Sequence, residues 1–445
     1  MSTVKVNKIT PRTSNSIQLG ESGDTLTIPS GATLQNCGTA TGFGISFCTT
    51  VKTSPFTATA GKGFFINTGS AVTVTLPASP STGDELIVID STGCAATNAI
   101  TLGRNGSKIK GGCNDLLMAT DRGGLRIVYS GASQGWITAT AGNDATMQPA
   151  FIAATGGTES TFGDFKIHTF TSDSTFQVTK TAASAPNNVI DYIVVAGGGG
   201  GGTGTSAGAG GGGAGGLRQF TSQPVSVQSY SVTVGGGGAG NGPGATPQPP
   251  GTDGNTSTFI SNTSAGGGGG GSQAPGSPAP NYNGNPGGSG GGGGYPGGSG
   301  GTGNTPPVSP AQGNNGAAIG GCNGGGGGGA GAAAVQASGP TVASPGGAGV
   351  DISPTYGPGV GASGFVAGGG GGGNYNACGS ASGGSGGGGA GGAKNPSGAV
   401  TGCNAVANTG GGGGGATSRA GPTVGPGMQG GNGGSGLVII RYKFQ

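Results

Sequence analysis

The chain of 445 residues has little charge, few aromatic side chains and a single histidine. Lys and Arg number 17 and Asp and Glu number 14, which gives a net charge of +3 and excludes the electrostatic footprint of a nucleic-acid-binding protein. The lone histidine, His168, lies in a strand-like segment without a visible partner for acid–base catalysis. Asp84 and Glu85 are better explained as the start of a strand. We therefore expect no enzyme activity and no cofactor.

The cysteines and the apolar segments likewise indicate no metal site and no membrane-spanning helix. The 7 cysteines are scattered without a C-x-x-C pair, which argues against a disulfide framework and against a zinc site. The chain contains no apolar run of the ~18 residues that a membrane-spanning helix needs. The sequence therefore predicts neither a metal centre nor membrane insertion.

Glycine is what the chain has in abundance. Of 116 glycines, 93 lie from Gly197 onward. Five runs contain six consecutive glycines each, and they cover residues 197–202, 266–271, 324–329, 368–373 and 410–415. A disordered tether would stay soluble through charged residues, yet only five occur between Gly197 and Ile440. We expect the runs to be ordered, with a flexible linker as the alternative.

A polyglycine run can be ordered in only a few ways. The polyproline II backbone has three residues per turn and no internal hydrogen bonds, so its amides and carbonyls need partners outside the helix. Neighbouring helices can supply them only where no Cβ intervenes. We therefore predict a lattice of polyglycine II helices. Its mid-run positions should tolerate no side chain, and they include Gly199, Gly268, Gly326, Gly370 and Gly412.

Strand-like segments frame these runs. β-Branched and apolar residues within 164–196, 225–234 and 436–444 predict strands. The apolar strands on either side of the lattice, about 240 residues apart, should pair with each other, since an unpaired apolar strand promotes aggregation.

The first half predicts further β-structure in two parts. Residues 1–46 contain short alternating strands that are too small to form a core alone, which favours intertwining with identical chains. Residues 47–143 read as a β-rich spacer with six strands, at 63–66, 71–76, 84–90, 99–102, 124–129 and 135–138. The predicted class is all-β, with a glycine-rich part over 144–445 and no α-helical domain. We expect a homotrimer formed through the first ~145 residues.

The segments between the glycine runs differ from one another and become loops at the lattice edge. A rigid scaffold that displays varied loops is typical of recognition surfaces, and tyrosine with asparagine and serine is typical of their contact residues. The candidate receptor-binding residues are Tyr282, Tyr295, Tyr356, Tyr375, Asn281, Asn374 and Asn376. The alternative for each tyrosine is that it packs against the side of the lattice.

Several of these segments resemble the glycine-rich C-terminal domain of bacteriophage tail fibres. The similarity covers about 280 residues and comprises, in order, 166–171, 192–202, 210–217, 230–235 and 433–442. The first 44 residues resemble the N-terminal segment of marine, cyanophage-type fibres, and the glycine runs are similar to the polyglycine II adhesins of some T-even-like phages. The resemblance does not identify individual binding residues.

The resemblance implies a tail fibre of the virion, made in the host cytoplasm and acting outside the cell. Such a protein attaches to other virion tail proteins by its N-terminus and recognises a host bacterial surface receptor, either a saccharide or an outer-membrane protein. It needs no nucleic acid and no membrane insertion. The alternative is a purely structural fibre or capsid decoration protein without a specific receptor.

Overall fold

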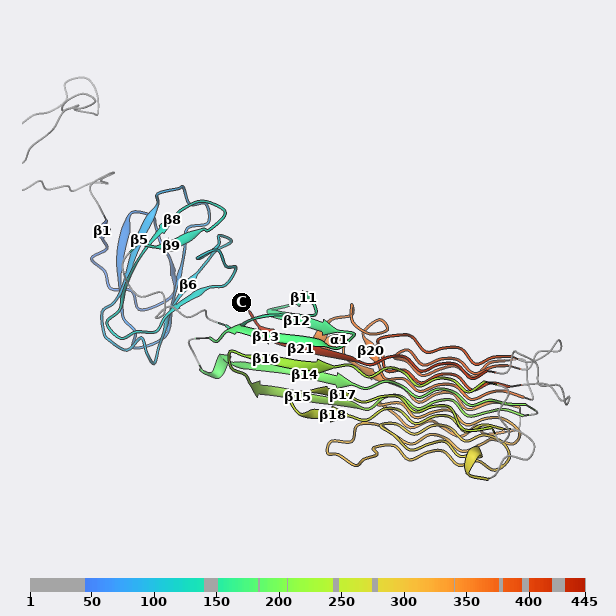
Figure 1. Ribbon diagram of the computed structural model, residues 1–445. Helices are drawn as coiled ribbons and strands as arrows, with labels where there is room; N and C mark the ends of the chain where they lie inside the picture. Colours follow the sequence, from blue (N-terminus) through green and yellow to red (C-terminus); the bar gives the residue numbers. More distant parts are fainter. Residues whose placement is uncertain are drawn as a thin grey trace, which may run out of the picture.

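The computed structural model shows two folded parts, one within the first 139 residues and one from residue 151 onward (Figure 1). The residues it describes are 45–139, 151–182, 185–205, 207–242, 248–273, 279–339, 341–375, 379–393, 400–417 and 429–444. The expected N-terminal segment lies almost entirely outside these residues, and so does the expected boundary at 143–144.

Two sheets form the first part. One has the order β1-β3-β5-β8-β9 and contains β1 (Ser46–Phe47), β3 (Lys62–Ile66), β5 (Glu85–Asp90), β8 (Gly124–Tyr129) and β9 (Trp136–Thr138). The other has the order β2-β4-β6-β7 and contains β2 (Phe56–Thr57), β4 (Val72–Thr75), β6 (Ile100–Gly103) and β7 (Leu116–Met118). The six strands expected from the sequence are all present. Their inward side chains form a closed apolar core that includes Leu86, Leu102 and Trp136.

Two more sheets belong to the second part. One has the order β10-β13-β16-β17-β18, with β10 (Ala153–Thr155), β13 (Ser174–Lys180), β16 (Ser229–Thr233), β17 (Ser257–Phe259) and β18 (Asn262–Ser264). The other has the order β11-β12-β21-β14-β15, with β11 (Thr158–Phe162), β12 (Phe165–Phe170), β21 (Leu437–Lys443), β14 (Val189–Val195) and β15 (Leu217–Pro224). The chain therefore enters and leaves the glycine-rich region through one sheet.

The expected pairing across the glycine region is confirmed. β14 and β21 are antiparallel neighbours, with Val194 opposite Val438 and Ile193 opposite Ile439. One face of this pair contributes to the core between the two sheets, together with Phe176 and Phe259. The other face packs under Ile352, Tyr356 and Val366. Both faces are buried, which explains why these strands read as continuous apolar runs.

Helix is almost absent from the described residues. They contain one α-helix of four residues, α1 (Ser353–Tyr356), two 3-10 turns, η2 (Ala185–Asn187) and η3 (Ala279–Tyr282), and the small β19 (Val350–Asp351) and β20 (Phe365–Val366) pair. The all-β class without a helical domain is therefore confirmed. Among these residues, no helix has the length and apolarity required to cross a membrane.

The glycine runs form a hydrogen-bonded lattice with a period of three residues. The N–H groups of the first run reach three antiparallel neighbours: Gly197 and Gly200 donate to the carbonyls of Asn255 and Thr252, Gly198 and Gly201 to those of Gly434 and Gly431, and Gly199 and Gly202 to those of Gly213 and Gly210. The N···O distances are 2.9 to 3.0 Å. Each bond leaves the run, as the polyproline II backbone requires.

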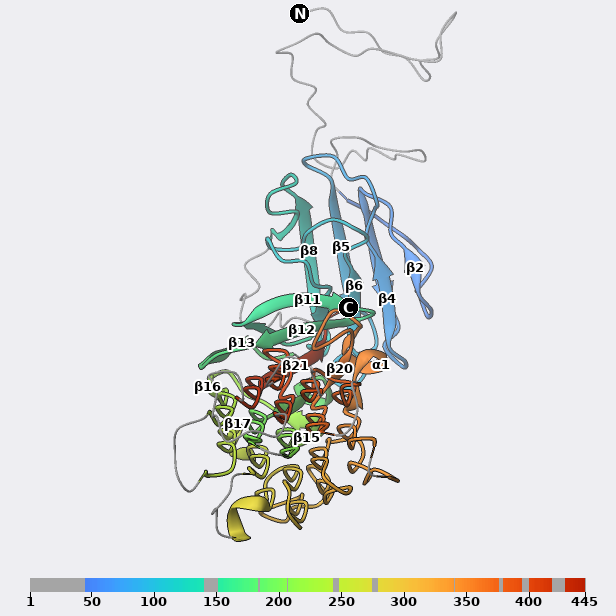
Figure 2. The same ribbon diagram turned by 90° about the vertical axis from the view of Figure 1, so that its right-hand side faces the viewer.

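The carbonyls of the same run are satisfied by three parallel neighbours. Those of Gly197 and Gly200 accept from Gly267 and Gly270, those of Gly198 and Gly201 from Gly238 and Asn241, and those of Gly199 and Gly202 from Gly413 and Ala416. Three antiparallel and three parallel neighbours thus surround one central segment. Figure 2 looks along the lattice and shows its segments as tight coils in cross-section.

Candidate functional site

The lattice has one end at the sheets and another end remote from them. β14 leads directly into the first glycine run, and residues 208–216 return directly to β15, so the turn between them marks the remote end. We call it the far end; it lies on the right in Figure 1, where η3 is drawn in yellow. Loops that are far apart in the sequence gather there.

Three of the four candidate tyrosines lie at the far end. Tyr295 donates its backbone N–H to the carbonyl of Gly208 at 3.3 Å, and the carbonyl of Tyr282 accepts from Gly294 at 2.7 Å. Tyr375 donates its backbone N–H to Asn323 Oδ1 at 2.8 Å. All three side chains are half-buried. Their backbones are anchored to the lattice while part of each ring remains accessible.

Tyr356 is a correction to the sequence prediction. It ends α1 at the sheet end of the lattice, is 2 % exposed, and belongs to the core above β14 and β21. Its ring lies beneath the Arg441 guanidinium, 5.5 Å from the ring centroid. Burial raises the pKa of its hydroxyl well above the usual value. Tyr356 is therefore a packing residue, because its aromatic area is already buried within the chain.

The candidate asparagines also differ in how much of each side chain is exposed. Asn281 is half-buried at the far end and donates its side-chain amide to the carbonyl of Gln248 at 2.7 Å. Asn374 is only 4 % exposed and donates to the carbonyl of Gly379 at 2.7 Å. Asn374 therefore supports a loop and has little surface to offer a partner, contrary to the sequence prediction. Asn376 lies outside the described residues.

A hollow of about 400 Å³ opens beside Asn374, between residues 341–345 and 379–382. We call it the Asn374 groove. Two buried amides hold its walls in place: Asn374 contacts the second loop as described, and Asn323 donates from Nδ2 to the carbonyl of Val342 at 3.1 Å. Asn323 is fully buried and lies at the start of a glycine run. The groove is therefore built on the rigid ends of lattice segments.

A second hollow of about 440 Å³ lies near the same end, and we call it the Asn404 groove. Its polar side chains are those of Thr401, Asn404, Gln429 and Asn432. The carbonyl of Gly431, beside it, accepts from Gly201 near the end of the first run. Asn404 Oδ1 accepts from the backbone N–H of Asn432 at 2.8 Å and ties the two walls together. Both grooves went unpredicted, because they arise from loops whose neighbours only the lattice determines.

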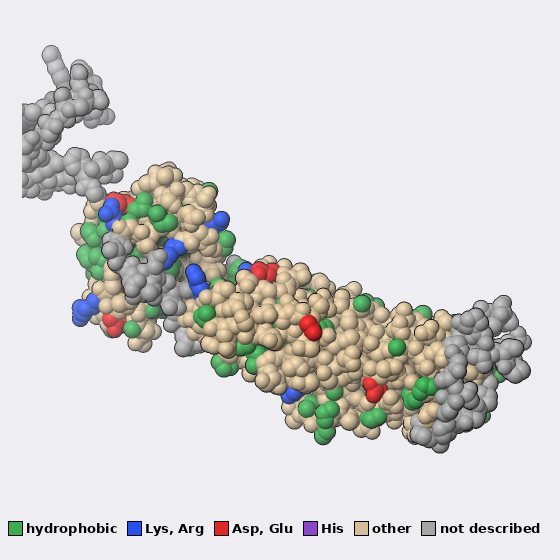
Figure 3. Space-filling model, in the orientation of Figure 1, with side chains coloured by type: hydrophobic (Ala, Val, Ile, Leu, Met, Phe, Trp, Pro, Cys, Tyr) green, Lys and Arg blue, Asp and Glu red, His purple; other side chains and the backbone are tan. Residues whose placement is uncertain are grey.

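The described far end is electrically neutral. None of its residues is Asp, Glu, Lys or Arg, and Figure 3 shows few charged side chains over the visible face of the lattice. Among the residues that the structure describes, no three His, Cys, Asp or Glu side chains gather as potential metal ligands. The arrangement suits contact through hydrogen bonds and apolar area.

The lone histidine has a structural environment. His168 in β12 is fully buried, with Nδ1 2.7 Å from the carbonyl oxygen of Gly156 and Nε2 3.2 Å from the Tyr442 hydroxyl. Burial lowers the pKa of its imidazole below the usual value. The neutral ring is thus a sheet residue with both nitrogens engaged.

The mid-run glycines occupy positions without room for a side chain. An added Cβ at Gly199, Gly268, Gly326, Gly370 or Gly412 would lie within 3.0 Å of a backbone oxygen of another segment. The close approach places Cα–H groups against carbonyls, a weak attraction that recurs throughout the lattice. Only glycine permits both the spacing and the hydrogen bonds.

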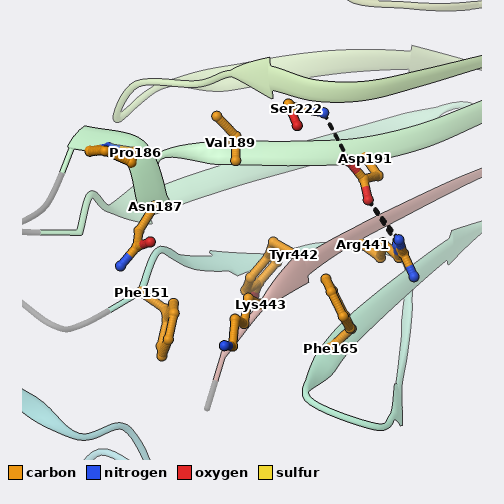
Figure 4. Close-up of a pocket in the computed structure, with 10 residues that line it drawn as sticks. All are labelled: Phe151, Phe165, Pro186, Asn187, Val189, Asp191, Ser222, Arg441, Tyr442 and Lys443. Atoms are coloured by element: carbon orange, nitrogen blue, oxygen red, sulfur yellow. Dashed lines mark hydrogen bonds and ion pairs between the residues drawn. The ribbon is translucent and has the colours of Figure 1, made fainter.

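One more hollow, of about 270 Å³, lies at the opposite end near the C-terminus (Figure 4). Its walls include Phe151, Phe165 and Lys443, and its floor includes the ion pair between Asp191 and Arg441. Figure 4 shows Asp191 between Ser222 and Arg441, and Ser222 donates its backbone N–H to Asp191 Oδ1 at 2.9 Å. Asp191 and Arg441 are paired with each other and the Lys443 ammonium lies over the Phe151 ring, so we assign this hollow to the scaffold.

Comparison with known proteins adds one finding. The profile of a family described as a glycine-rich domain matches residues 170–443. The match begins within the sheets and ends at β21, so it includes both the framing strands and the lattice. No curated protein matches the chain in sequence.

Proposed function

The chain belongs to the glycine-rich domain family, and from that premise we propose that it is a bacteriophage tail fibre protein that recognises a host cell-surface receptor with its far end. Its N-terminus attaches it to other proteins of the virion tail. It is made in the host cytoplasm, acts outside the cell and carries out no catalysis.

The observation that carries the proposal is the gathering of dissimilar loops at one end of a rigid lattice. Residues around Tyr282, Tyr295 and Tyr375 come from separate parts of the sequence, and their backbones bond to lattice segments. A scaffold fixed by backbone hydrogen bonds leaves the loop side chains free to vary. The second part begins with β10 in the sheets, at the opposite end of the lattice from the far end, as an adhesive tip on a fibre requires (Figure 1).

The first part supports the proposed homotrimer. The outer face of the sheet containing β5 carries Phe47, Phe65, Ile87, Ile89 and Ile137, of which Phe47 is 40 % and Ile137 38 % exposed. Parallel strands such as β1, β3 and β5 are usually covered on both faces. Sedimentation of the full chain is the test, and a stable monomer would contradict this assembly.

Selective adsorption tests the function itself. Fluorescently labelled full-length protein should bind some strains in a panel of bacteria and leave others unlabelled, and excess unlabelled protein should abolish that binding. Equal labelling of all strains, or of none, would contradict receptor recognition.

A structural fibre or decoration protein remains the second candidate, because a lattice of backbone hydrogen bonds resists proteolysis with or without a receptor. Dissimilar loops at the far end favour recognition, since a merely protective lattice needs no such diversity. Protein that incorporates into virions but labels no strain would favour this second function.

A further inference from the structure

The Asn374 groove has the chemistry of a site for a neutral, hydroxyl-rich ligand. Thr341, Ser380 and Ser382 are exposed along its walls, and their hydroxyls form no hydrogen bond within the described part of the chain. Val342, 55 % exposed, and Pro345 provide apolar surface beside them. A sugar ring presents the matching combination of hydroxyl groups and C–H faces.

The size and rigidity of the groove fit a small bound unit. A volume of about 400 Å³ falls in the range of roughly 300–1,000 Å³ that is usual for ligand sites. The loops that form it are held by the buried amides of Asn323 and Asn374. Because the walls are fixed before binding, little conformational entropy is lost when a ligand enters.

The lack of charge in the described far end distinguishes between the classes of ligand that could bind there. The residues that line the two grooves include no Lys or Arg that could bind phosphate or carboxylate groups, so neither groove offers an anionic polymer an ion pair. A protein loop would need a larger apolar centre for its anchor residues, whereas this groove is small and combines apolar side chains with three hydroxyl groups. The Asn404 groove presents amide and hydroxyl groups at the same end, so a polymer with neutral repeating units finds two sites.

Resting on the proposed recognition of bacterial surfaces, we infer that the Asn374 groove binds a neutral saccharide of the bacterial cell surface. Its hydroxyls bond to Thr341, Ser380 and Ser382, and its C–H face lies against Val342 and Pro345. The tyrosines at the far end then lie outside the primary contact. Specificity resides in the groove walls.

The test uses the full-length fluorescent protein on a strain that it labels selectively. Mild periodate treatment of the cells, which cleaves sugar rings at vicinal diols, should remove the labelling, whereas protease treatment should leave it. Polysaccharide purified from the same strain should compete for binding. Labelling that survives periodate but is lost after protease would identify a protein receptor and overturn the inference while leaving the proposed function intact.

Variants locate the site within the chain. Ser382→Trp fills the groove and should reduce labelling at least about tenfold, and each of Thr341→Ala and Ser380→Ala should reduce it about fivefold through the loss of one hydrogen bond. The matched control is Ser385→Trp, an exposed serine of the same segment located toward the sheets, which should label within about twofold of the unmodified chain. Unchanged melting temperatures confirm that the variants fold.

Two outcomes would overturn the assignment to this groove. Periodate-sensitive labelling that Ser382→Trp leaves unchanged would place the saccharide elsewhere on the chain. Equal losses for Ser382→Trp and Ser385→Trp would show that the effect is not specific to the groove. Absence of selective labelling by the unmodified chain would instead reject the proposed function.

Discussion

The Asp191 carboxylate and the Arg441 guanidinium, 250 positions apart in the chain, form an ion pair with an N···O distance of 2.8 Å. Asp191 lies in β14, just before the glycine-rich region, and Arg441 lies in β21, just after it. Arg441 also donates to the carbonyl of Thr355 at 2.8 Å and covers the rings of Phe165 and Tyr356. One side chain therefore joins the two framing strands to α1.

Removal of this cation should destabilise the second part. Arg441→Met keeps the length of the side chain but leaves Asp191 without its partner and Thr355 without its donor. Because both charged side chains are less than one-fifth exposed, we expect a loss of about 1–3 kcal/mol, between the values for surface and buried pairs. Thermal unfolding followed by calorimetry measures it. The double variant with Asp191→Asn should cost less than the sum of the two single changes.

A side chain within a glycine run should be as costly as a severe core mutation. Gly199→Val places its Cβ within 3.0 Å of the Gly268 carbonyl oxygen and forces two segments apart. We expect a loss of about 2–5 kcal/mol. Gly359→Val is the matched control, because an added Cβ there meets nothing within 4 Å, and it should cost less than about 0.5 kcal/mol. Equal melting temperatures for the two variants would show that the runs behave as linkers.

Acid should weaken the first part through Asp90. This side chain is 3 % exposed, and burial alone would raise its pKa. Hydrogen bonds from the Gly93, Arg122 and Thr92 amides and from the Thr68 hydroxyl outweigh burial and lower the pKa from 3.8 to about 2. Since the folded-state pKa is below the unfolded value, the stabilisation is present above about pH 4 and is lost as the pH falls toward 2.

The Asp90→Asn variant should show the same effect at neutral pH. It replaces a carboxylate that accepts several donors with an amide that accepts fewer, and we expect a loss of about 2 kcal/mol. Unfolding monitored through Trp136 fluorescence, at pH 7 and at pH 2.5, separates the two contributions. A difference between variant and unmodified protein that does not shrink at the lower pH would contradict this role for the charge.

The effect of replacing a candidate tyrosine on stability should depend on where that tyrosine lies in the fold. Tyr356→Ala should lower the melting temperature, because it empties a buried site and costs about 3–5 kcal/mol. Tyr282→Ala, Tyr295→Ala and Tyr375→Ala should leave folding nearly intact, and any loss of bacterial labelling among them would locate receptor contacts beside the grooves.

Labelling should change little between low and high salt, since the described far end carries no charge. Strong dependence on salt would direct attention to Lys394 and Arg419, which lie outside the described residues.

Sequence patterns predicted the strands well, because a strand buried on one face alternates apolar and polar residues and a strand buried on both faces is a continuous apolar run. The alternation in β4 matches its alternately buried residues, and the apolar run of β14 pairs with β21 as expected. β15 was not expected, since its mostly exposed residues, Leu217–Pro224, carry little apolar signal. Pairing partners within the lattice were equally unpredictable, because identical glycines contain no information about which segment lies beside which.

The sequence predicted the kind of site, a recognition surface, but only some of the residues that form it. Tyrosine and asparagine in loops indicated a recognition surface, yet Tyr356 and Asn374 proved to be buried. Nothing in the local sequence distinguishes Tyr356 from Tyr375, because Tyr356 is buried by residues far away in the sequence, which include Ile193, Ile439 and Arg441. The grooves depend in the same way on contacts such as that of Asn323 with the Val342 carbonyl.

The three-residue alternation of hydrogen bonds has a mechanical consequence. The first glycine run is joined to six neighbouring segments, and those bonds lie across the lattice axis, along which a load applied at the far end would act. Such a load acts on many bonds in shear at once, whereas a hairpin loaded at one end opens bond by bond. Forced unfolding depends on the barrier to that first collective slip. The lattice should therefore act as a stiff rod that transmits tension with little extension.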